Sequence, residues 1–216
     1  MPQIFHRSAN TIAKVSIFGT VFFLAGLGWY GATIVRSPWT TRVGHALDQP
    51  VPFSHQHHVE GLGIDCRYCH TSVEDSSFAG IPPTQTCMNC HSVMWNKAPM
   101  LEPVRESFRT EEPIQWVRVH DLPDFVYFDH SIHVAKGVAC ITCHGPVNEM
   151  PLTWRQNTLR MEWCLQCHKA PEKQIGPKDK VFDVHWKKPA NFEETHKEVI
   201  SEAKLGKITN CSICHR

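Results

Sequence analysis

The longest apolar stretch of the chain lies near its beginning, from residue 15 to residue 35. Its sequence is VSIFGTVFFLAGLGWYGATIV, 21 residues without a formal charge. About 20 such residues span the hydrocarbon core of a bilayer as a helix. A cleaved signal peptide would have a shorter apolar region and a cleavage site between small residues, whereas the candidate sites here place Trp29 or Tyr30 three residues before the cut. We therefore expect residues 1–36 to form a short cytoplasmic head and an uncleaved transmembrane anchor.

Beyond this anchor the hydrophobic pattern is weak. Apolar residues across 101–108 are spaced for one short amphipathic helix. Asn191 and Glu194 predict the start of a second helix through a capping box, and we expect this helix to end at about Leu205, before Gly206. The pattern predicts a mainly α-helical fold with little regular secondary structure.

Length and charge set the class of the protein. A chain of 216 residues and 24.7 kDa forms one domain or two small ones. Its formal net charge is only +1, and no Lys/Arg-rich patch dominates the sequence, so we expect no nucleic-acid partner.

The motif Cys-x-x-Cys-His is typical of covalent attachment of a c-type haem, in which the two thiols bind the porphyrin and the His binds the iron. Five copies use all ten cysteines of the chain, which leaves none for disulfides or a catalytic thiol. Structural zinc also uses paired Cys-x-x-Cys motifs, but zinc gives no reason for a His after every second Cys. The attachment residues are Cys66, Cys69, Cys87, Cys90, Cys140, Cys143, Cys164, Cys167, Cys211 and Cys214. The proximal iron ligands are His70, His91, His144, His168 and His215.

An internal duplication surrounds four of these motifs. The segment FSHQHHVEGLGIDCRYCH at 53–70 and the segment FDHSIHVAKGVACITCH at 128–144 share the order Phe-x-His-x-x-His-Val, a glycine, then Cys-x-x-Cys-His. A second attachment motif follows each copy. The expected divisions of the chain are the anchor at 1–36, a linker at 37–52, two-haem modules at 53–110 and 111–170, and a C-terminal segment with the fifth haem at 171–216.

Ten histidines remain as candidates for the opposite face of each iron. His55, His58, His130 and His133 occupy matching positions in the duplication, and two imidazoles at this spacing lie on one face of a helix. The fifth distal ligand is expected to be His120, with His185 and then His196 as alternatives. A haem with His on both faces has no open position for a substrate, so the sequence predicts an electron-transfer protein without catalytic residues of its own.

The place of haem attachment determines the compartment. Bacteria form the thioether bonds of haem c outside the cytoplasmic membrane, so we expect the chain after residue 36 to be periplasmic. The anchor would then hold five haems beside the cytoplasmic membrane.

The repeated units resemble the multihaem cytochrome c3/c7 family. The runs QPVPFSHQHHVEGLGIDCRYCHTSVEDS, AGIPPTQTCMNCH, VRVHDLPDFVYFDHSIHVAKGVACITCHG and MEWCLQCH, within residues 49–216, are similar to the membrane-anchored pentahaem cytochrome c subunits of alternative complex III. The resemblance implies five bis-His haems and a route for electrons from quinol. It also implies four kinds of partner: an iron–sulfur, molybdopterin-oxidoreductase-like subunit, polytopic quinol-oxidising subunits, a monohaem cytochrome c and a terminal oxidase.

Two other functions fit parts of the sequence. A tetrahaem-type membrane quinol dehydrogenase would feed a periplasmic reductase, but five motifs and a long extracytoplasmic part disfavour it. A nitrite, hydroxylamine or sulfite reductase needs a haem with one vacant face, whereas the chain contains no Cys-x-x-Cys-Lys variant and has histidines to spare.

Overall fold

The computed structural model describes residues 4–206 and 208–215 and divides the chain into two compact units. Unit 1 comprises Met1–Val43 and unit 2 comprises Gly44–Arg216. The division falls within the predicted linker, and all five Cys-x-x-Cys-His motifs lie in unit 2.

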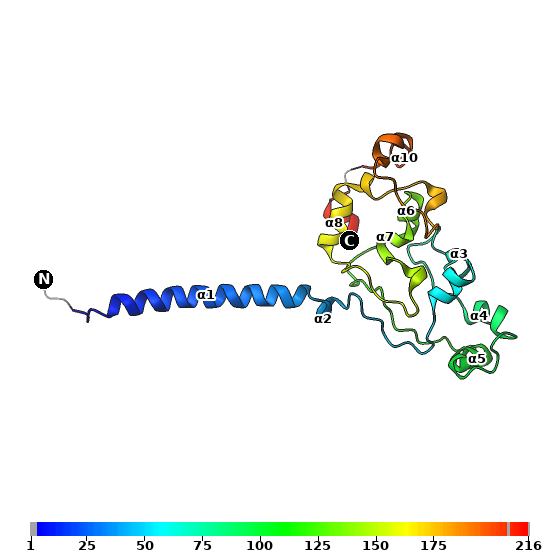
Figure 1. Cartoon of the computed structure of the whole chain (residues 1–216), viewed down its shortest axis with the longest axis horizontal. Helices are drawn as coiled ribbons and strands as arrows, with labels where there is room; N and C mark the ends of the chain where they lie inside the picture. The colour runs from blue at the N-terminus through cyan, green and yellow to red at the C-terminus, as the bar shows by residue number, and fades with distance from the viewer. Residues whose placement is uncertain (1–3, 207, 216) are drawn as a thin grey trace. The chain divides into compact units, whose positions relative to one another are not determined.

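Unit 1 is built on the long helix α1 (Ala9–Arg36), followed by the short helix α2 (Pro38–Thr41) (Figure 1). Helix α1 ends where Pro38 forces the preceding Ser37 into an extended conformation, with φ −70° and ψ 159°. Its apolar residues are not buried in the protein. By length and composition α1 can cross a bilayer, although a signal sequence has the same properties.

The first half of unit 2 contains η1 (Gln56–Gly61, a π-helical turn), α3 (Cys66–Cys69), α4 (Thr84–His91), η2 (Pro99–Leu101) and α5 (Glu102–Thr110). Helices α4 and α5 pack together. Leu101 and Val104 are 9% and 3% exposed and form a small cluster with Val51, whereas Phe108 is 44% exposed. The amphipathic helix expected across 101–108 is thus present, and its apolar side holds α4 in place.

The second half of unit 2 contains α6 (His130–Ala135), α7 (Cys140–His144), η3 (Val147–Glu149), α8 (Met161–Lys169), η4 (Pro171–Lys173) and η5 (Lys178–Lys180). The described part of the chain forms isolated bridges between Ala46 and Trp154 and between Val138 and Ile175, and no named strand. The mainly α-helical prediction is confirmed.

The C-terminal segment differs from its prediction. Instead of one helix from residue 191 to about 205, the chain forms α9 (Phe192–Thr195) and α10 (Lys197–Glu202), then α11 (Cys211–Cys214). The break falls at His196, whose backbone has φ −121° and ψ 42°. Its ring stacks on Phe192 with centroids 4.3 Å apart, and Phe192 is buried in the core, a tertiary effect that local capping signals do not report. The prediction of a continuous helix was wrong.

The duplication extends to the backbone. Gly63 and Gly137 each lie three residues before the first cysteine of their copy, and they have φ values of 66° and 83°. Residues other than glycine rarely adopt this left-handed backbone conformation. At Gly137 a Cβ atom would also lie 2.2 Å from the carbonyl oxygen of Gly176. Both copies therefore turn into their attachment motif in the same way, which only glycine permits without strain.

Candidate haem-binding sites

Each of the five motifs forms a single helical turn within α3, α4, α7, α8 or α11. Cysteines three residues apart in a helix lie on one face, and all ten thiols are free. The cysteines of each pair are therefore presented together, as attachment to one flat group requires. We number the sites by sequence: site 1 (Cys66–His70), site 2 (Cys87–His91), site 3 (Cys140–His144), site 4 (Cys164–His168) and site 5 (Cys211–His215).

The histidines that end four of the motifs are oriented by backbone carbonyls. In each, the Nδ1–H group donates to a carbonyl oxygen outside the motif, which leaves Nε2 as the nitrogen available to a metal. These bonds join His70 to Gly80 (2.7 Å), His91 to Met94 (3.1 Å), His168 to Ile208 (2.9 Å) and His215 to Phe125 (3.0 Å). All four acceptors lie in loops, where the sequence gives no signal for them.

The two Phe-x-His-x-x-His segments have the same side-chain geometry. Phe53 stacks on His58 with ring centroids 4.5 Å apart and planes inclined by 22°, and it meets His55 edge-on at 4.9 Å. Phe128 repeats both contacts, at 4.6 Å and 27° with His133 and at 4.7 Å edge-on with His130. The phenylalanine of each copy therefore fixes two imidazoles that point in different directions.

Hydrogen bonds complete the orientation of these imidazoles. The Nδ1–H groups of His58 and His133 donate to the carbonyl oxygens of Ser54 and Asp129, at 2.8 and 2.6 Å. His130 Nδ1–H donates to Ser77 O at 2.8 Å. His55 Nδ1 shares a hydrogen bond of 2.9 Å with the hydroxyl of Thr153, a partner that sequence reasoning missed. Every one of the four matched histidines thus has Nδ1 engaged and Nε2 left for another group.

Three of these imidazoles face a motif histidine at one particular separation. Ring centroids are 6.2 Å apart for His58 and His91, 6.4 Å for His130 and His144, and 6.1 Å for His133 and His168. An imidazole nitrogen lies about 2 Å from a bound metal, so two rings on opposite sides of one metal ion have centroids roughly 6 Å apart. The spacing in all three pairs is that of two axial ligands.

Comparison with known proteins identifies the family. A model of cytochrome c7 and related cytochrome c matches residues 126–216. The multihaem cytochrome c subunit of menaquinone reductase from Nitratidesulfovibrio vulgaris (strain Hildenborough) is 33% identical over 150 residues, which cover 60% of this chain and 71% of that protein. The chain belongs to the multihaem cytochrome c family. Another relative, the acrylate reductase cytochrome subunit of Shewanella woodyi, is 28% identical over 112 residues, covering 52% of this chain and 69% of that protein.

The residues of this multihaem cytochrome fit haem c. Membership in the family implies covalently bound haem, and the free thiol pairs, carbonyl-oriented imidazoles and axial separations are what haem c needs. The protein's own apolar core is small: in the part of the chain that the structure describes, the large side chains less than 2% exposed are Met150, Ile175 and Phe192. The short helices that carry the motifs cannot bury all their apolar side chains against one another, so a haem can cover the rest.

Five histidines gather where the two copies of the repeat meet. Burial and the neighbouring imidazoles lower the pKa of His55 to about 4 and that of His144 to about 3. His120 lies in the same group, with its ring 4.3 Å from that of His144, and burial lowers its pKa to about 4. All three are therefore neutral at physiological pH, the form that binds a metal. The group consists of His55, His70, His120, His130 and His144.

His120 has the property expected of a ligand. Its Nε2 atom is buried and has no hydrogen-bond partner, which is costly for a polar group unless something binds it. Its 4.3 Å approach to His144 is too close for those two rings to take opposite faces of one iron. Of the alternatives, His185 is 70% exposed and lies 3.5 Å from Glu60, and His196 stacks on Phe192.

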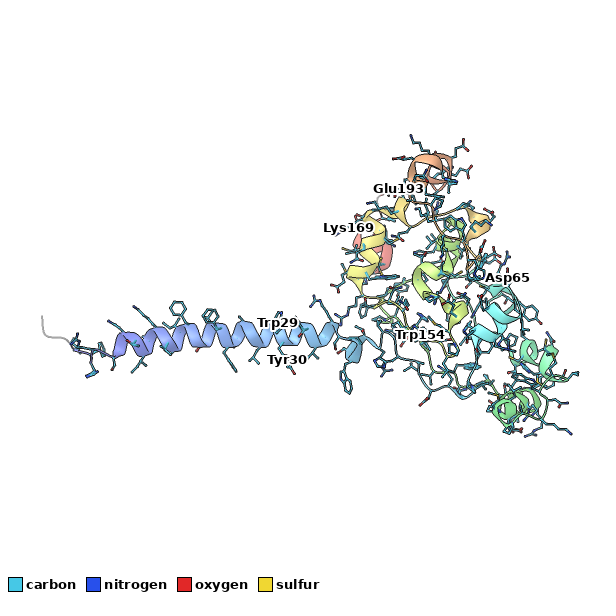
Figure 2. The ribbon with its side chains drawn as sticks, in the orientation of Figure 1. Trp29, Tyr30, Asp65, Trp154, Lys169 and Glu193 are labelled. Atoms are coloured by element: carbon cyan, nitrogen blue, oxygen red, sulfur yellow. The ribbon has the colours of Figure 1, made fainter. Side chains whose placement is uncertain are left out.

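A carboxylate precedes the first motif. Asp65 caps α3 by accepting a hydrogen bond of 2.8 Å from the backbone N–H of Arg67 (Figure 2). The Arg67 side chain also donates to Asp65, and these hydrogen bonds hold the pKa of the carboxyl below its usual value. Arg67 in turn lies over the ring of Phe182, 4.4 Å from its centroid. The Asp65–Arg67 pair thus connects the start of site 1, through Arg67, to Phe182 in the segment that follows η5.

Proposed function

We propose that this multihaem cytochrome carries five bis-His haem c groups and transfers electrons for a membrane complex that reacts with quinones. The observation that supports it most directly is the set of three imidazole pairs with centroids 6.1 to 6.4 Å apart, because axial saturation leaves no position for a substrate. Each bound haem c would supply one-electron Fe(III)/Fe(II) chemistry. The protein's part is to attach, orient and saturate these irons.

The ligand assignment follows from the geometry and the repeat. We propose Cys66, Cys69, Cys87, Cys90, Cys140, Cys143, Cys164, Cys167, Cys211 and Cys214 as attachment residues. The proximal ligands are His70, His91, His144, His168 and His215, and the distal ligands are His55, His58, His120, His130 and His133. The ring separations support the pairing of His58 with site 2, His130 with site 3 and His133 with site 4.

The partners are inferred from the relatives and the sequence resemblance. One relative belongs to a menaquinone reductase, and the resemblance to alternative complex III implies an iron–sulfur, molybdopterin-oxidoreductase-like subunit and polytopic membrane subunits. Electrons would leave to a monohaem cytochrome c or a terminal oxidase. Helix α1 would anchor the chain in the cytoplasmic membrane with unit 2 on the periplasmic side. Purification from detergent-solubilised membranes should recover these partners together with this chain.

Counting haems tests the proposal directly. Intact-mass measurement of the purified chain should show five covalently attached haems, and N-terminal peptides from residues before α1 should be recovered if the anchor is retained. The reduced protein should not take up carbon monoxide without denaturation. Fewer than five haems, or ready carbon monoxide binding, would contradict the proposal of five saturated irons.

A second function is favoured by one relative. The acrylate reductase cytochrome subunit of Shewanella woodyi belongs, by its name, to a system that reduces an organic substrate. This chain could correspondingly feed a periplasmic reductase, as a tetrahaem-type quinol dehydrogenase does. Recovery of a soluble reductase instead of polytopic quinol-oxidising subunits would select this function.

A further inference from the structure

The five attachment sites are not arranged in space as they are in sequence. Site 1 lies against site 2 through residues placed between the cysteines of each motif: the side-chain amide of Asn89 donates to the hydroxyl of Tyr68 over 3.2 Å. Burial raises the pKa of the Cys69 thiol, and the nearby thiol of Cys87 raises it further. Helices α3 and α4 are therefore direct neighbours.

Site 1 also lies against site 3. The first cysteines of the two copies of the repeat, Cys66 and Cys140, lie close enough that each shifts the pKa of the other's thiol. The loop after site 1 meets the start of α6 as well, where Ser77 O accepts from both the backbone N–H and Nδ1–H of His130, at 3.2 and 2.8 Å. Site 1 is thus the member of the first copy that touches the second copy.

Sites 3 and 4 are joined by α6 and by the segment before α8. The imidazoles of His130 and His133, one helical turn apart, face the histidines of site 3 and site 4 respectively. The side chain of Asn157 donates to Cys143 O over 2.9 Å. These contacts place α7 beside α8.

Site 5 adjoins site 4. His168 of site 4 donates to the carbonyl oxygen of Ile208, three residues before Cys211. The thiol of Cys214 is near enough to contribute, after burial, to raising the pKa of Cys164. Figure 1 shows α4, α3, α7 and α8 following one another across unit 2, with the C-terminus near α8.

We propose that the five haem sites form one line in the spatial order 2–1–3–4–5. The duplication explains the exchange of sites 1 and 2, because the two copies meet through the first motif of each. Site 2 and site 5 are then the ends of the line, the positions where electrons from outside partners would enter and leave. This inference rests on the proposed function, since it requires all five sites to carry haem.

Removing one haem at a time tests the order. Neighbouring irons interact by Coulomb's law, so removing one shifts the midpoint potentials of the haems beside it much more than those farther away. The full-length variants are Cys66→Ala/Cys69→Ala, which removes site 1, and Cys87→Ala/Cys90→Ala, which removes site 2. Each would be titrated electrochemically and followed by visible and EPR spectroscopy.

The proposed order predicts that removing site 1 shifts two of the remaining potentials, whereas removing site 2 shifts one. If the sites instead followed the sequence order, removing site 1 would shift one potential and removing site 2 would shift two. This result would overturn the proposal. Removing site 5 with Cys211→Ala/Cys214→Ala is the matched control, because both orders predict one shifted potential. The intact mass of the wild-type chain distinguishes failure of the proposed function from failure of the proposed order. Fewer than five attached haems would contradict the function, whereas five haems with the wrong pattern of shifts would contradict the order.

If a cysteine variant fails to acquire its remaining haems, the order can be tested with a variant that changes an axial ligand and retains every thioether bond. His58→Met changes an imidazole that faces site 2, and Met ligation raises a haem's potential. In the order 2–1–3–4–5, this change alters the titration of one neighbouring haem. Altered titration of two neighbours would overturn the proposed order.

Discussion

Phe128 lies nearly flat against the imidazole of His133, with ring centroids 4.6 Å apart and planes inclined by 27°. The centroid of the same imidazole lies 6.1 Å from that of His168. By stacking on its face, the phenylalanine restricts the ring plane of a proposed axial ligand. The same relationship joins Phe53 to His58 in the first copy of the repeat, so the conserved geometry is a feature of the duplicated unit.

Replacing Phe128 should loosen this ligand. We expect Phe128→Ala to lower the free energy of unfolding by about 1–2 kcal/mol, from the lost burial and ring contact of a half-buried side chain. The EPR signals of the two haems at sites 3 and 4 should also broaden, because Phe128 contacts both His130 and His133 and the planes of both imidazoles would be less restricted. Denaturant unfolding and low-temperature EPR measure the two effects.

The control for this variant is Phe78→Ala. Phe78 is 57% exposed, and an exposed substitution should change the free energy of unfolding by less than about 0.5 kcal/mol. An unchanged EPR spectrum in Phe128→Ala would show that the phenylalanine does not orient an axial ligand.

Adjacent histidines in the first copy should behave differently. His58 faces His91 at 6.2 Å, whereas the ring of His57 stacks on Trp95 at 5.5 Å. Because His–Met ligation raises haem potential, His58→Met should raise one of the five potentials, and His57→Met should raise none. A spectroelectrochemical titration decides the matter, and a raised potential in His57→Met alone would contradict the assignment.

The cap of α3 predicts a pH-dependent stability. Asp65→Ala removes the side-chain acceptor for Arg67 N–H and should cost about 1 kcal/mol at neutral pH. The folded protein holds the pKa of Asp65 below its usual value of 3.8. The stabilisation is therefore complete above pH 3.8 and is lost as pH falls through the lowered pKa. Wild type and Asp65→Ala should become equally stable at the acid end.

Asp65→Asn is the matched control for this effect. Asparagine caps helices about as well as aspartate but carries no charge to pair with Arg67. It should retain most of the stability at neutral pH and show little of the pH dependence. Thermal unfolding across the acid range measures all three proteins, and a constant difference between wild type and Asp65→Ala would contradict the assignment of the cap to the ionised carboxylate.

The turn before site 3 should tolerate no side chain. Gly137 has φ 83°, and a Cβ there would lie 2.2 Å from Gly176 O, so Gly137→Ala should destabilise the protein by more than about 1 kcal/mol. Gly61 has no positive φ, and a Cβ there would lie 3.6 Å from Gln56 O, an ordinary contact. Gly61→Ala should therefore be neutral or slightly stabilising. Equal stability of the two variants in denaturant unfolding would be inconsistent with the described turn.

Local signals in the sequence were sufficient for the mainly helical fold and the duplicated turns, and they predict the attachment motifs. A Cys-x-x-Cys-His motif acts within one helical turn, and the Phe-x-His-x-x-His segment needs only neighbouring residues to fix its rings. The amphipathic helix now seen as α5 was predicted for the same reason. The continuous helix across 191–205 was predicted wrongly, because the stacking of His196 on Phe192 depends on burial that capping residues do not encode.

The sequence by itself determined which side chains carry the chemistry: ten thiols in five pairs and a surplus of imidazoles. Only the tertiary structure decided which imidazole faces which motif, which carbonyl orients each ring, and that site 1 rather than site 2 meets site 3. The physical reason is that a six-coordinate haem iron takes ligands on two opposite faces. In the proposed sites one would come from the motif itself, whereas the other would come from a segment that folding brings across from elsewhere in the chain.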